Sequence, residues 1–257
     1  MGDVKLPNVL LLKISPPMQS WGVGDLYDSN RKTNRFPTKS GVIGMIAAAM
    51  GWDRNHDLND LNKLKMGVRV DSPGDLEKDF QVIKKPGEAN GKPSNRWYLS
   101  DAVFIVALQS DDLGLLESIE SALRDPVFNL YAGRKAFPLN FDLVQGIREG
   151  TNIQELFDSL DWMGRGDKPD KIEVIRDANF SDLDVETVSD IPVNFELDHR
   201  EWALRTITRS WMNLNHPANS DIACEDDGLD WLDMDDDDDQ DNPNSLNDFD
   251  FMTGEEM

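Results

Sequence analysis

The sequence has too little of several residue types to support some common functional classes. Its 257 residues include one cysteine, Cys224, so an internal disulfide framework is excluded and a zinc site would lack a second thiol. No GxGxxG motif occurs, and no GxxxxGK followed by Ser or Thr, so nucleotide hydrolysis has no motif support. We therefore expect neither a metal nor a cofactor.

Long apolar runs are also missing. The N-terminal run VLLLKI contains Lys13, and the run from Val42 to Met50 has about half the length of a membrane-spanning helix. No small-residue cleavage pattern follows the first run. The expectation is a cytoplasmic protein with no signal peptide and no membrane anchor.

Positive charge is scarce overall but is unevenly spread. The formal net charge is −23, yet residues 221–257 hold 16 Asp or Glu and no Lys or Arg, which leaves 33 acids against 26 bases in residues 1–220. Two segments of that body are basic, RKTNRFPTK at 31–39 and KKPGEANGKPSNR at 84–96. Local cationic patches are therefore compatible with the acidic average, and nucleic-acid binding is not excluded.

Hydrophobic periodicity predicts an α+β fold. Strands are expected near 8–15, 65–71, 80–84, 101–109 and 127–131, and helices at 41–50 and 112–124. The order strand, helix, strand, strand, helix, strand is typical of ferredoxin-like folds, which RNA-recognition domains share with many unrelated proteins. A helix near 152–160 and strands near 171–176 and 191–197 follow, while DHREWALRTITRSWM fits either a helix or a strand.

Three parts are predicted along the chain. Residues 1–140 form a ferredoxin-like (RRM-like) palm, residues 141–218 form a small β-rich C-terminal extension that packs on the palm, and residues 219–257 form an acidic tail. Five consecutive aspartates at 235–239 and the loss of periodicity predict that this tail is disordered. The tail is either a solubilising appendage or an element that binds basic protein surfaces or repels unwanted nucleic acid.

The segment RFPTKSGVIGMIAAAMG, from Arg35 to Gly51, predicts an anion-binding loop in front of a buried helix. Thr38 or Ser40 is the expected cap, since a hydroxyl oxygen accepts the unpaired N–H groups of the first turn. Those N–H groups, together with Arg35 and Lys39, favour a phosphate at this end of the helix. The alternative is a cap with a purely structural role.

The segment KKPGEANGKPSNR separates two strand-like stretches and predicts a protruding hairpin. Its four basic residues stand beside Trp97 and Tyr98; they are Lys84, Lys85, Lys92 and Arg96. This combination suits single-stranded nucleic acid, because cations neutralise phosphates while aromatic rings stack on bases. A solvated basic loop whose aromatic residues begin the next strand is equally compatible with the pattern.

Four separated segments together resemble one family. They are MQSWG at 18–22, RFPTKSGVIGMIAAAMG at 35–51, WYLSDAVFIVAL at 97–108 and YAGRKAFPL at 131–139, with a weaker match in SDIPVNFELDHREWALRTI at 189–207. They resemble the CasD family of subunits of the type I-E CRISPR surveillance complex, Cascade. The resemblance implies an RNA-binding palm with a β-hairpin thumb at about residues 72–100. Such a subunit caps the 5′ handle of the CRISPR RNA and contacts the backbone subunit and the large subunit, which recognises the foreign DNA target.

The resemblance also implies which residues face the RNA. They are Gln19, Ser20, Trp21 and Gly22 after the first strand, Arg31, Arg35, Thr38, Lys39 and Ser40 in the basic loop, and Tyr131, Gly133, Arg134 and Lys135 in a second glycine loop. Lys84, Lys85 and Arg96 of the hairpin complete the predicted RNA-binding set. Two alternatives stay open: Trp21 closes the edge of the core, or Arg134 forms a structural ion pair.

The chain departs from the family pattern in three places. The finger at 84–96 is short for the thumb, and the acidic tail has no expected counterpart. Phe137 stands where a cysteine before proline is often found, a change expected to affect packing only.

A metal-independent ribonuclease is the alternative function, since some type I-C relatives cut precursor CRISPR RNA. Such cleavage needs a general base and a general acid, commonly His, Tyr or Lys. His56, His199 and His216 lie outside the matching loops, whereas a pair such as Tyr98 with Lys39 stays open. We expect a non-catalytic subunit; a nucleic-acid-binding protein unrelated to CRISPR, or an adaptor that acts through its tail, is a third interpretation.

Overall fold

The computed structural model describes residues 6–22, 30–84, 86–87, 90–196 and 200–214. Lys85 and the acidic tail predicted at 219–257 lie outside the described residues. The α+β class is confirmed, and no helix in the described ranges is long and apolar enough to cross a membrane. The helices are α1 (Lys39–Ala49), α2 (Asn59–Asn62), α3 (Leu113–Arg124) and α4 (Ile153–Ser159).

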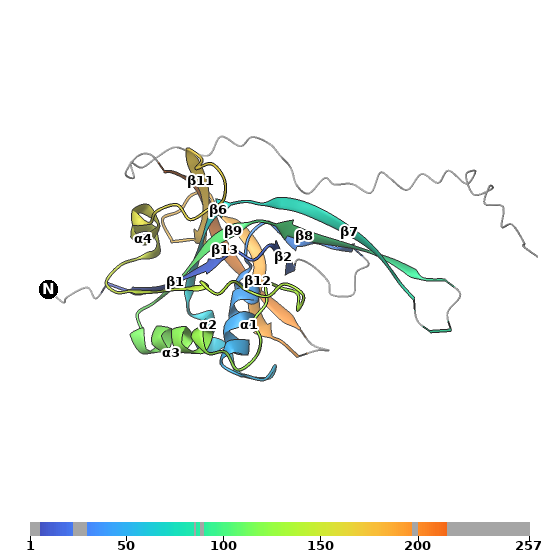
Figure 1. Cartoon of the computed structure of the whole chain (residues 1–257). Coiled ribbons are helices and arrows are strands. Elements are labelled where there is room, and N and C mark those ends of the chain that lie inside the picture. The colour runs from blue at the N-terminus through green and yellow to red at the C-terminus, as the bar shows by residue number, and fades with distance from the viewer. Residues whose placement is uncertain (1–5, 23–29, 85, 88–89, 197–199, 215–257) are drawn as a thin grey trace, which may run out of the picture. The chain divides into compact units, whose positions relative to one another are not determined.

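The main sheet is antiparallel and has seven strands in the order β10-β1-β9-β6-β11-β13-β12 (Figure 1). These strands are β1 (Asn8–Ile14), β6 (Lys65–Ser72), β9 (Val103–Ser110), β10 (Val144–Arg148), β11 (Lys171–Asp177), β12 (Glu186–Asn194) and β13 (Glu201–Asn213). The predicted order of strand, helix, strand, strand, helix and strand is found in β1, α1, β6, β9, α3 and β10. Their four strands take adjacent positions at one end of the sheet.

The last strand of that series is not where the sequence pattern predicts it. Residues 127–131 form no strand: Val127 and Phe128 are 66% and 53% exposed, and Tyr131 makes only an isolated bridge to Pro138. The N–H of Val127 donates instead to the carbonyl of Ala49 at the end of α1, 3.0 Å away. The prediction was wrong because this short apolar run packs against a helix end, while the edge position beside β1 is taken by β10.

The C-terminal strands extend the same sheet beyond β6. β11 pairs with β6 on one side and with β13 on the other, so these strands are hydrogen-bonded into the palm sheet. The segment that fitted either a helix or a strand is the strand β13. β12 closes this edge, and its register with β13 shifts twice, between Ser189 and Ile191 and between Pro192 and Asn194.

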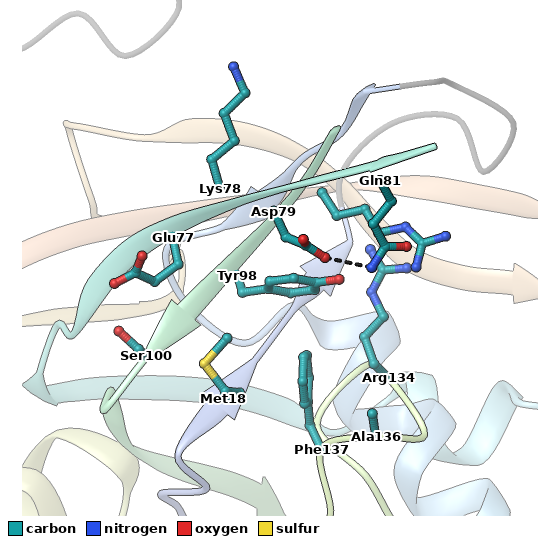
Figure 2. Close-up of a pocket in the computed structure, with 11 residues that line it drawn as sticks. Met18, Glu77, Lys78, Asp79, Gln81, Tyr98, Ser100, Arg134, Ala136 and Phe137 are labelled. Carbon is teal, nitrogen blue, oxygen red and sulfur yellow. Dashed lines mark hydrogen bonds between the residues drawn. The ribbon is translucent and has the colours of Figure 1, made fainter. Parts of the chain in front are cut away.

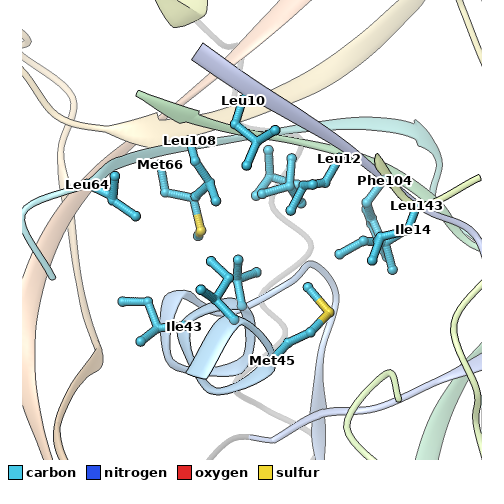
Figure 3. Packing of buried hydrophobic residues seen from close by; sticks show 14 of the residues in the cluster. Leu10, Leu12, Ile14, Ile43, Met45, Leu64, Met66, Phe104, Leu108 and Leu143 are labelled. Atoms are coloured by element: carbon cyan, nitrogen blue, oxygen red, sulfur yellow. The ribbon is translucent and has the colours of Figure 1, made fainter. Parts of the chain in front are cut away.

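α1 packs its apolar side chains against one face of the sheet (Figure 3). Ile43 and Met45 of this helix face Leu10 and Leu12 of β1 and Met66 of β6. Each fully buried side chain of this size contributes roughly 1.5–3 kcal/mol of transfer free energy. The prediction of a buried helix is confirmed, and its first turn is thereby fixed against the sheet.

A long β-hairpin runs out from the sheet between β6 and β9 (Figure 1). Its strands, β7 (Asp75–Ile83) and β8 (Lys92–Ser100), pair along their whole length, which is longer than the finger at 84–96 indicates. Two-residue connections at 73–74 and 101–102 join it to β6 and β9. Gly74 and Asp101 take positive φ angles there, +68° and +56°.

Short strands from the loop before α1 line the base of this hairpin. They are β2 (Met18–Gln19), β3 (Trp21–Gly22), β4 (Asn30–Arg31) and β5 (Thr33–Asn34). β2 and β4 pair with β8, β4 in the parallel direction, and β3 pairs with β5. This loop therefore lies against the hairpin strand that carries Arg96 and Tyr98.

Candidate nucleic-acid interface

The loop after β1 is anchored through buried side chains. Gln19 is fully buried and its Nε2 donates to the carbonyl of Ala102 at 2.8 Å, while Trp21 Nε1 donates to Gln19 Oε1 at 3.1 Å. Ser20 is buried as well. Gln19 is occupied inside the protein and Ser20 is shielded from solvent, so the geometry does not favour the predicted contact of these side chains with RNA, which stays a prediction. Trp21 closes the edge of the core, and Gly22 is exposed with open space where a side chain would be.

The N-terminus of α1 binds an anion, but the anion belongs to the protein. Thr38 is the cap: its Oγ1 accepts from the Gly41 N–H at 3.2 Å. The Lys39 N–H donates to Asp190 Oδ2 at 2.9 Å, so a carboxylate of β12 occupies the place predicted for a phosphate. Ser40 is partly buried and its hydroxyl lies 3.4 Å from that of Thr38.

Lys39 is a structural residue. It is 4% exposed, and its Nζ donates to the carbonyls of Leu64 at 2.7 Å and Asn62 at 3.2 Å. Asp177 lies 3.6 Å from the same ammonium. Burial lowers the pKa of Lys39 from its ordinary value, although Asp177 and Asp190 act in the opposite direction. These partners hold the ammonium inside the protein, so the geometry does not favour the predicted phosphate contact of Lys39, which stays a prediction.

The second glycine loop docks on the first loop through backbone contacts. Gly133 has φ of +80°, and a Cβ at this position would collide with the carbonyl oxygen of Ser20. The Ser20 N–H also donates to the carbonyl of Ala132 at 3.1 Å. Gly133 therefore allows a close approach to the protein's own backbone, which fixes the residues that follow, including Arg134.

Three arginines from distant segments meet beside Tyr98, and we call Arg31, Arg96 and Arg134 the arginine cluster. Arg31 and Arg96 are register partners in the parallel pairing of β4 with β8. The Arg134 guanidinium lies over the Tyr98 ring, 5.6 Å from its centroid. Burial lowers the pKa of Arg134, and the charges of Arg31 and Arg96 lower it further.

The positive charges of the arginine cluster are not neutralised by carboxylates among the residues that the structure describes. In the described part of the chain none of the three forms a salt bridge, and Arg96 Nε is buried without a hydrogen-bond partner. Like charges this close repel each other, so the arrangement favours an anion that bridges them. Phosphate is an anion that guanidinium groups recognise through paired N–H donors.

A pocket of about 690 Å³ opens beside the arginine cluster at the base of the hairpin (Figure 2). Tyr98 and Phe137 meet edge-on in it, with ring centroids 5.1 Å apart. Across from them, Gln81 Nε2 donates to Asp79 Oδ2 at 2.6 Å. The lining residues are Met18, Glu77, Lys78, Asp79, Gln81, Arg96, Tyr98, Ser100, Arg134, Ala136 and Phe137.

A family model described as CRISPR-associated protein (Cas_Cas5) matches residues 9–249. The chain belongs to this Cas5 family. Among its relatives is the CRISPR system Cascade subunit CasD of Escherichia coli (strain K12), which is 30% identical over 167 residues, 57% of this chain and 74% of that protein.

Two solved structures agree with this assignment. A chain of a CRISPR RNA-guided surveillance complex is 30% identical, with a TM-score of 0.68 over 80% of this chain and 90% of that one. A structure described as Cas protein is 32% identical, with a TM-score of 0.61 over 80% of this chain and 95% of that one.

The remaining predicted RNA-binding residues of this Cas5 protein do not line the pocket. Arg35 is partly buried in the loop before α1, and Lys84 is exposed where β7 has ended. Tyr131 and Lys135 are exposed on the second glycine loop. Their contact with RNA stays a prediction.

Sequence reasoning missed the acidic wall of the pocket. Glu77, Asp79 and Gln81 alternate along DLEKDFQVI, and this period of two was a usable signal that they share a face of a strand. Phe137 does more than pack, since its ring forms part of the pocket with Tyr98. In the described residues no group of three or more His, Cys, Asp or Glu is placed to hold a metal.

Proposed function

We propose that this Cas5-family chain is a non-catalytic CRISPR RNA-binding subunit of a type I-E Cascade complex, in which it caps the 5′ handle of the CRISPR RNA. The observation that carries the proposal is the arginine cluster, three guanidinium groups brought together from β4, β8 and the second glycine loop beside Tyr98. Phosphates of a hooked single strand suit such a cluster, and an exposed base suits the aromatic pocket next to it.

The palm of this subunit is of the ferredoxin-like kind. Its element order and the sheet order β10-β1-β9-β6, all antiparallel, support that description, with the β7–β8 hairpin as the thumb inserted between β6 and β9. The strands β11 to β13 are an addition to this palm at its β6 edge.

The proposed partners are the backbone subunit and the large subunit of Cascade in the cytoplasm, and foreign DNA reaches the protein only through the assembled complex. The support is the similarity to a Cascade subunit and to a chain of an RNA-guided surveillance complex. Hairpin residues Phe80 and Val82, 62% and 58% exposed, offer apolar surface for such contacts.

The ribonuclease alternative has less support from the geometry. Lys39, the proposed partner of Tyr98, is held by Asn62, Leu64 and Asp177 and does not line the pocket. His56 stacks on Trp52 with ring centroids 4.0 Å apart, and His199 and His216 lie outside the described residues. Incubation of the purified protein with repeat RNA in the absence of metal tests this point: a specific cleavage product would overturn the non-catalytic assignment.

The main test is co-purification of the protein with the products of its genomic neighbours, followed by sequencing of the bound RNA. Repeat-derived RNA with a shared 5′ end is expected. The double variant Arg96→Ala/Arg134→Ala should lose this RNA, whereas Arg124→Ala, which removes an exposed arginine paired with Glu120 on α3, should retain it. Recovery of a complex without repeat-derived RNA from the unaltered protein would contradict the proposal.

A further inference from the structure

Two carboxylates stand where a simple phosphate-binding groove would have none. Glu77 and Asp79 of β7 are the register partners of Tyr98 and Arg96 of β8, so all four share one face of the hairpin. Asp79 accepts a hydrogen bond from Gln81, and in the described residues neither carboxylate forms a salt bridge with the arginine cluster. Because carboxylates repel phosphate, general affinity for RNA does not account for them.

The pocket therefore has two walls: the hairpin wall carries the carboxylates of Glu77 and Asp79 beside Arg96, and the second glycine loop carries Arg134. An ionised carboxylate only accepts hydrogen bonds and a guanidinium only donates them. Asp79 lies above the Tyr98 ring, and Arg134 reaches the same space from the second glycine loop (Figure 2). The volume of about 690 Å³ falls in the range of pockets that enclose small molecules, and the rings of Tyr98 and Phe137 supply an apolar surface.

Among the four RNA bases, guanine matches these two walls best. Its Watson–Crick edge presents two adjacent donors, N1–H and the exocyclic amino group, which one carboxylate can accept together. Its O6 and N7 are the acceptors that arginine reads with paired donors. Uracil has a single donor between two acceptors, and adenine and cytosine place a ring acceptor beside their amino group, so each leaves an unsatisfied group against a carboxylate.

We propose that this pocket is guanine-selective: Asp79 accepts from the Watson–Crick edge of one unstacked guanine, Arg134 donates to O6 and N7, and Arg31 and Arg96 hold the adjoining phosphate. Gln81 is a positioning residue that orients the Asp79 carboxylate. This inference rests on the proposed RNA-binding function and adds the base that the site selects.

The test uses the full-length protein and an eight-nucleotide oligouridine in which one central position is varied. Fluorescence anisotropy should give about tenfold tighter binding with guanosine at that position than with uridine, adenosine or cytidine. Asp79→Asn should reduce the guanosine preference to within about twofold and keep or raise the affinity for plain oligouridine, because a charge that repels phosphate is removed. Asp75→Asn, on the same strand but outside the pocket lining, is the matched control and should keep the preference.

Modified bases test the same interactions on the unaltered protein, so the result does not depend on how a variant folds. Inosine lacks the amino group and 7-deazaguanosine lacks N7; each should weaken binding several-fold. In Asp79→Asn, inosine and guanosine should bind equally. Equal affinity for all four bases, with oligouridine binding that still requires Arg134, would overturn the guanine pocket and leave RNA binding intact. Absence of any RNA binding would overturn the proposed function itself.

Discussion

The guanidinium of Arg134 lies over the ring of Tyr98, 5.6 Å from the ring centroid, in a cation–π contact. Tyr98 is itself buried and braced edge-on by Phe137. An arginine without a carboxylate partner in the described part of the chain is thus held in place by an aromatic face.

Removal of that aromatic face should weaken RNA binding while the charge is kept. Tyr98→Leu is expected to reduce affinity for single-stranded RNA about fivefold, because it removes a partly desolvated cation–π interaction and a stacking surface. Tyr98→Phe keeps the ring and should bind within about twofold of the unaltered protein. Anisotropy titrations check both variants; an equal loss of affinity in the two would assign the effect to the hydroxyl group.

The salt dependence of RNA binding should report the arginine cluster. On a single strand, each phosphate that is no longer neutralised reduces the slope of log K against log salt by about 0.7. Arg31→Ala and Arg96→Ala, which remove the two residues assigned to the phosphate, should each flatten the slope by about this amount, and the double variant by about twice as much. Arg124→Ala should leave the slope unchanged, and titrations over a series of salt concentrations separate these outcomes.

Gly133→Ala should destabilise the protein and the pocket together. The positive φ is unfavourable for alanine, and the new methyl group would meet the Ser20 carbonyl, so we expect a loss of about 2–3 kcal/mol in the free energy of unfolding. Gly150→Ala is a matched control: φ there is +65°, but the space is open, so only about 1 kcal/mol should be lost. Urea unfolding of both variants measures the difference, and equal losses would mean that the contact with Ser20 relaxes freely.

Asp190 should be important for stability because it accepts three hydrogen bonds from two residues inside the protein. Its carboxylate accepts from Arg205 Nε at 2.8 Å and Nη2 at 2.6 Å, and also from the Lys39 N–H. Asp190→Ala leaves a buried guanidinium with one carboxylate partner fewer and should cost about 3–5 kcal/mol. Asp60→Ala, which breaks an exposed pair with Lys63, should change the unfolding free energy by less than about 0.5 kcal/mol.

Asp182 should contribute to acid sensitivity. Hydrogen bonds from Arg176 lower the pKa of this carboxyl below its ordinary value of 3.8, and the Asn179 N–H acts in the same direction. A lowered native pKa gives stability that is present above the ordinary value and is lost as the pH falls through the lowered one. The unaltered protein should therefore lose more unfolding free energy between about pH 6 and about pH 3 than Asp182→Asn does. Identical pH profiles in urea unfolding would contradict this assignment.

The elements of the palm were predictable because each has a local signal. The apolar run after Thr38 specifies α1 and its cap, and Asp112 caps α3 by accepting from the Leu115 N–H at 3.1 Å. β10 was missed because four of its residues are partly buried, Arg148 is exposed and the burial shows no clear alternation, whereas the largely exposed run at 127–131 imitates a strand.

The site was predictable residue by residue but not as an arrangement. Arg31, Arg96 and Arg134 are visible as basic residues in the sequence, yet their meeting depends on the register of β4 with β8 and on the docking of Gly133 against Ser20. Lys39 is a residue that the sequence singles out but whose role it does not decide. Its sequence context is equally suited to a phosphate or to a carboxylate, and the deciding partners, Asp177 and Asp190, come from strands far along the chain.

The hairpin is joined to the main sheet by two short connections. β7 and β8 continue β6 and β9 across two-residue connections, and the backbone angles at Gly74 and Asp101 set the bend on both strands. The pocket walls on the hairpin are therefore assembled when β6 pairs with β9 in the centre of the palm. On the proposed function, folding and not RNA meets the entropic cost of ordering Asp79 opposite Arg96, and such preorganisation leaves more of the interaction with a single nucleotide for the choice of base.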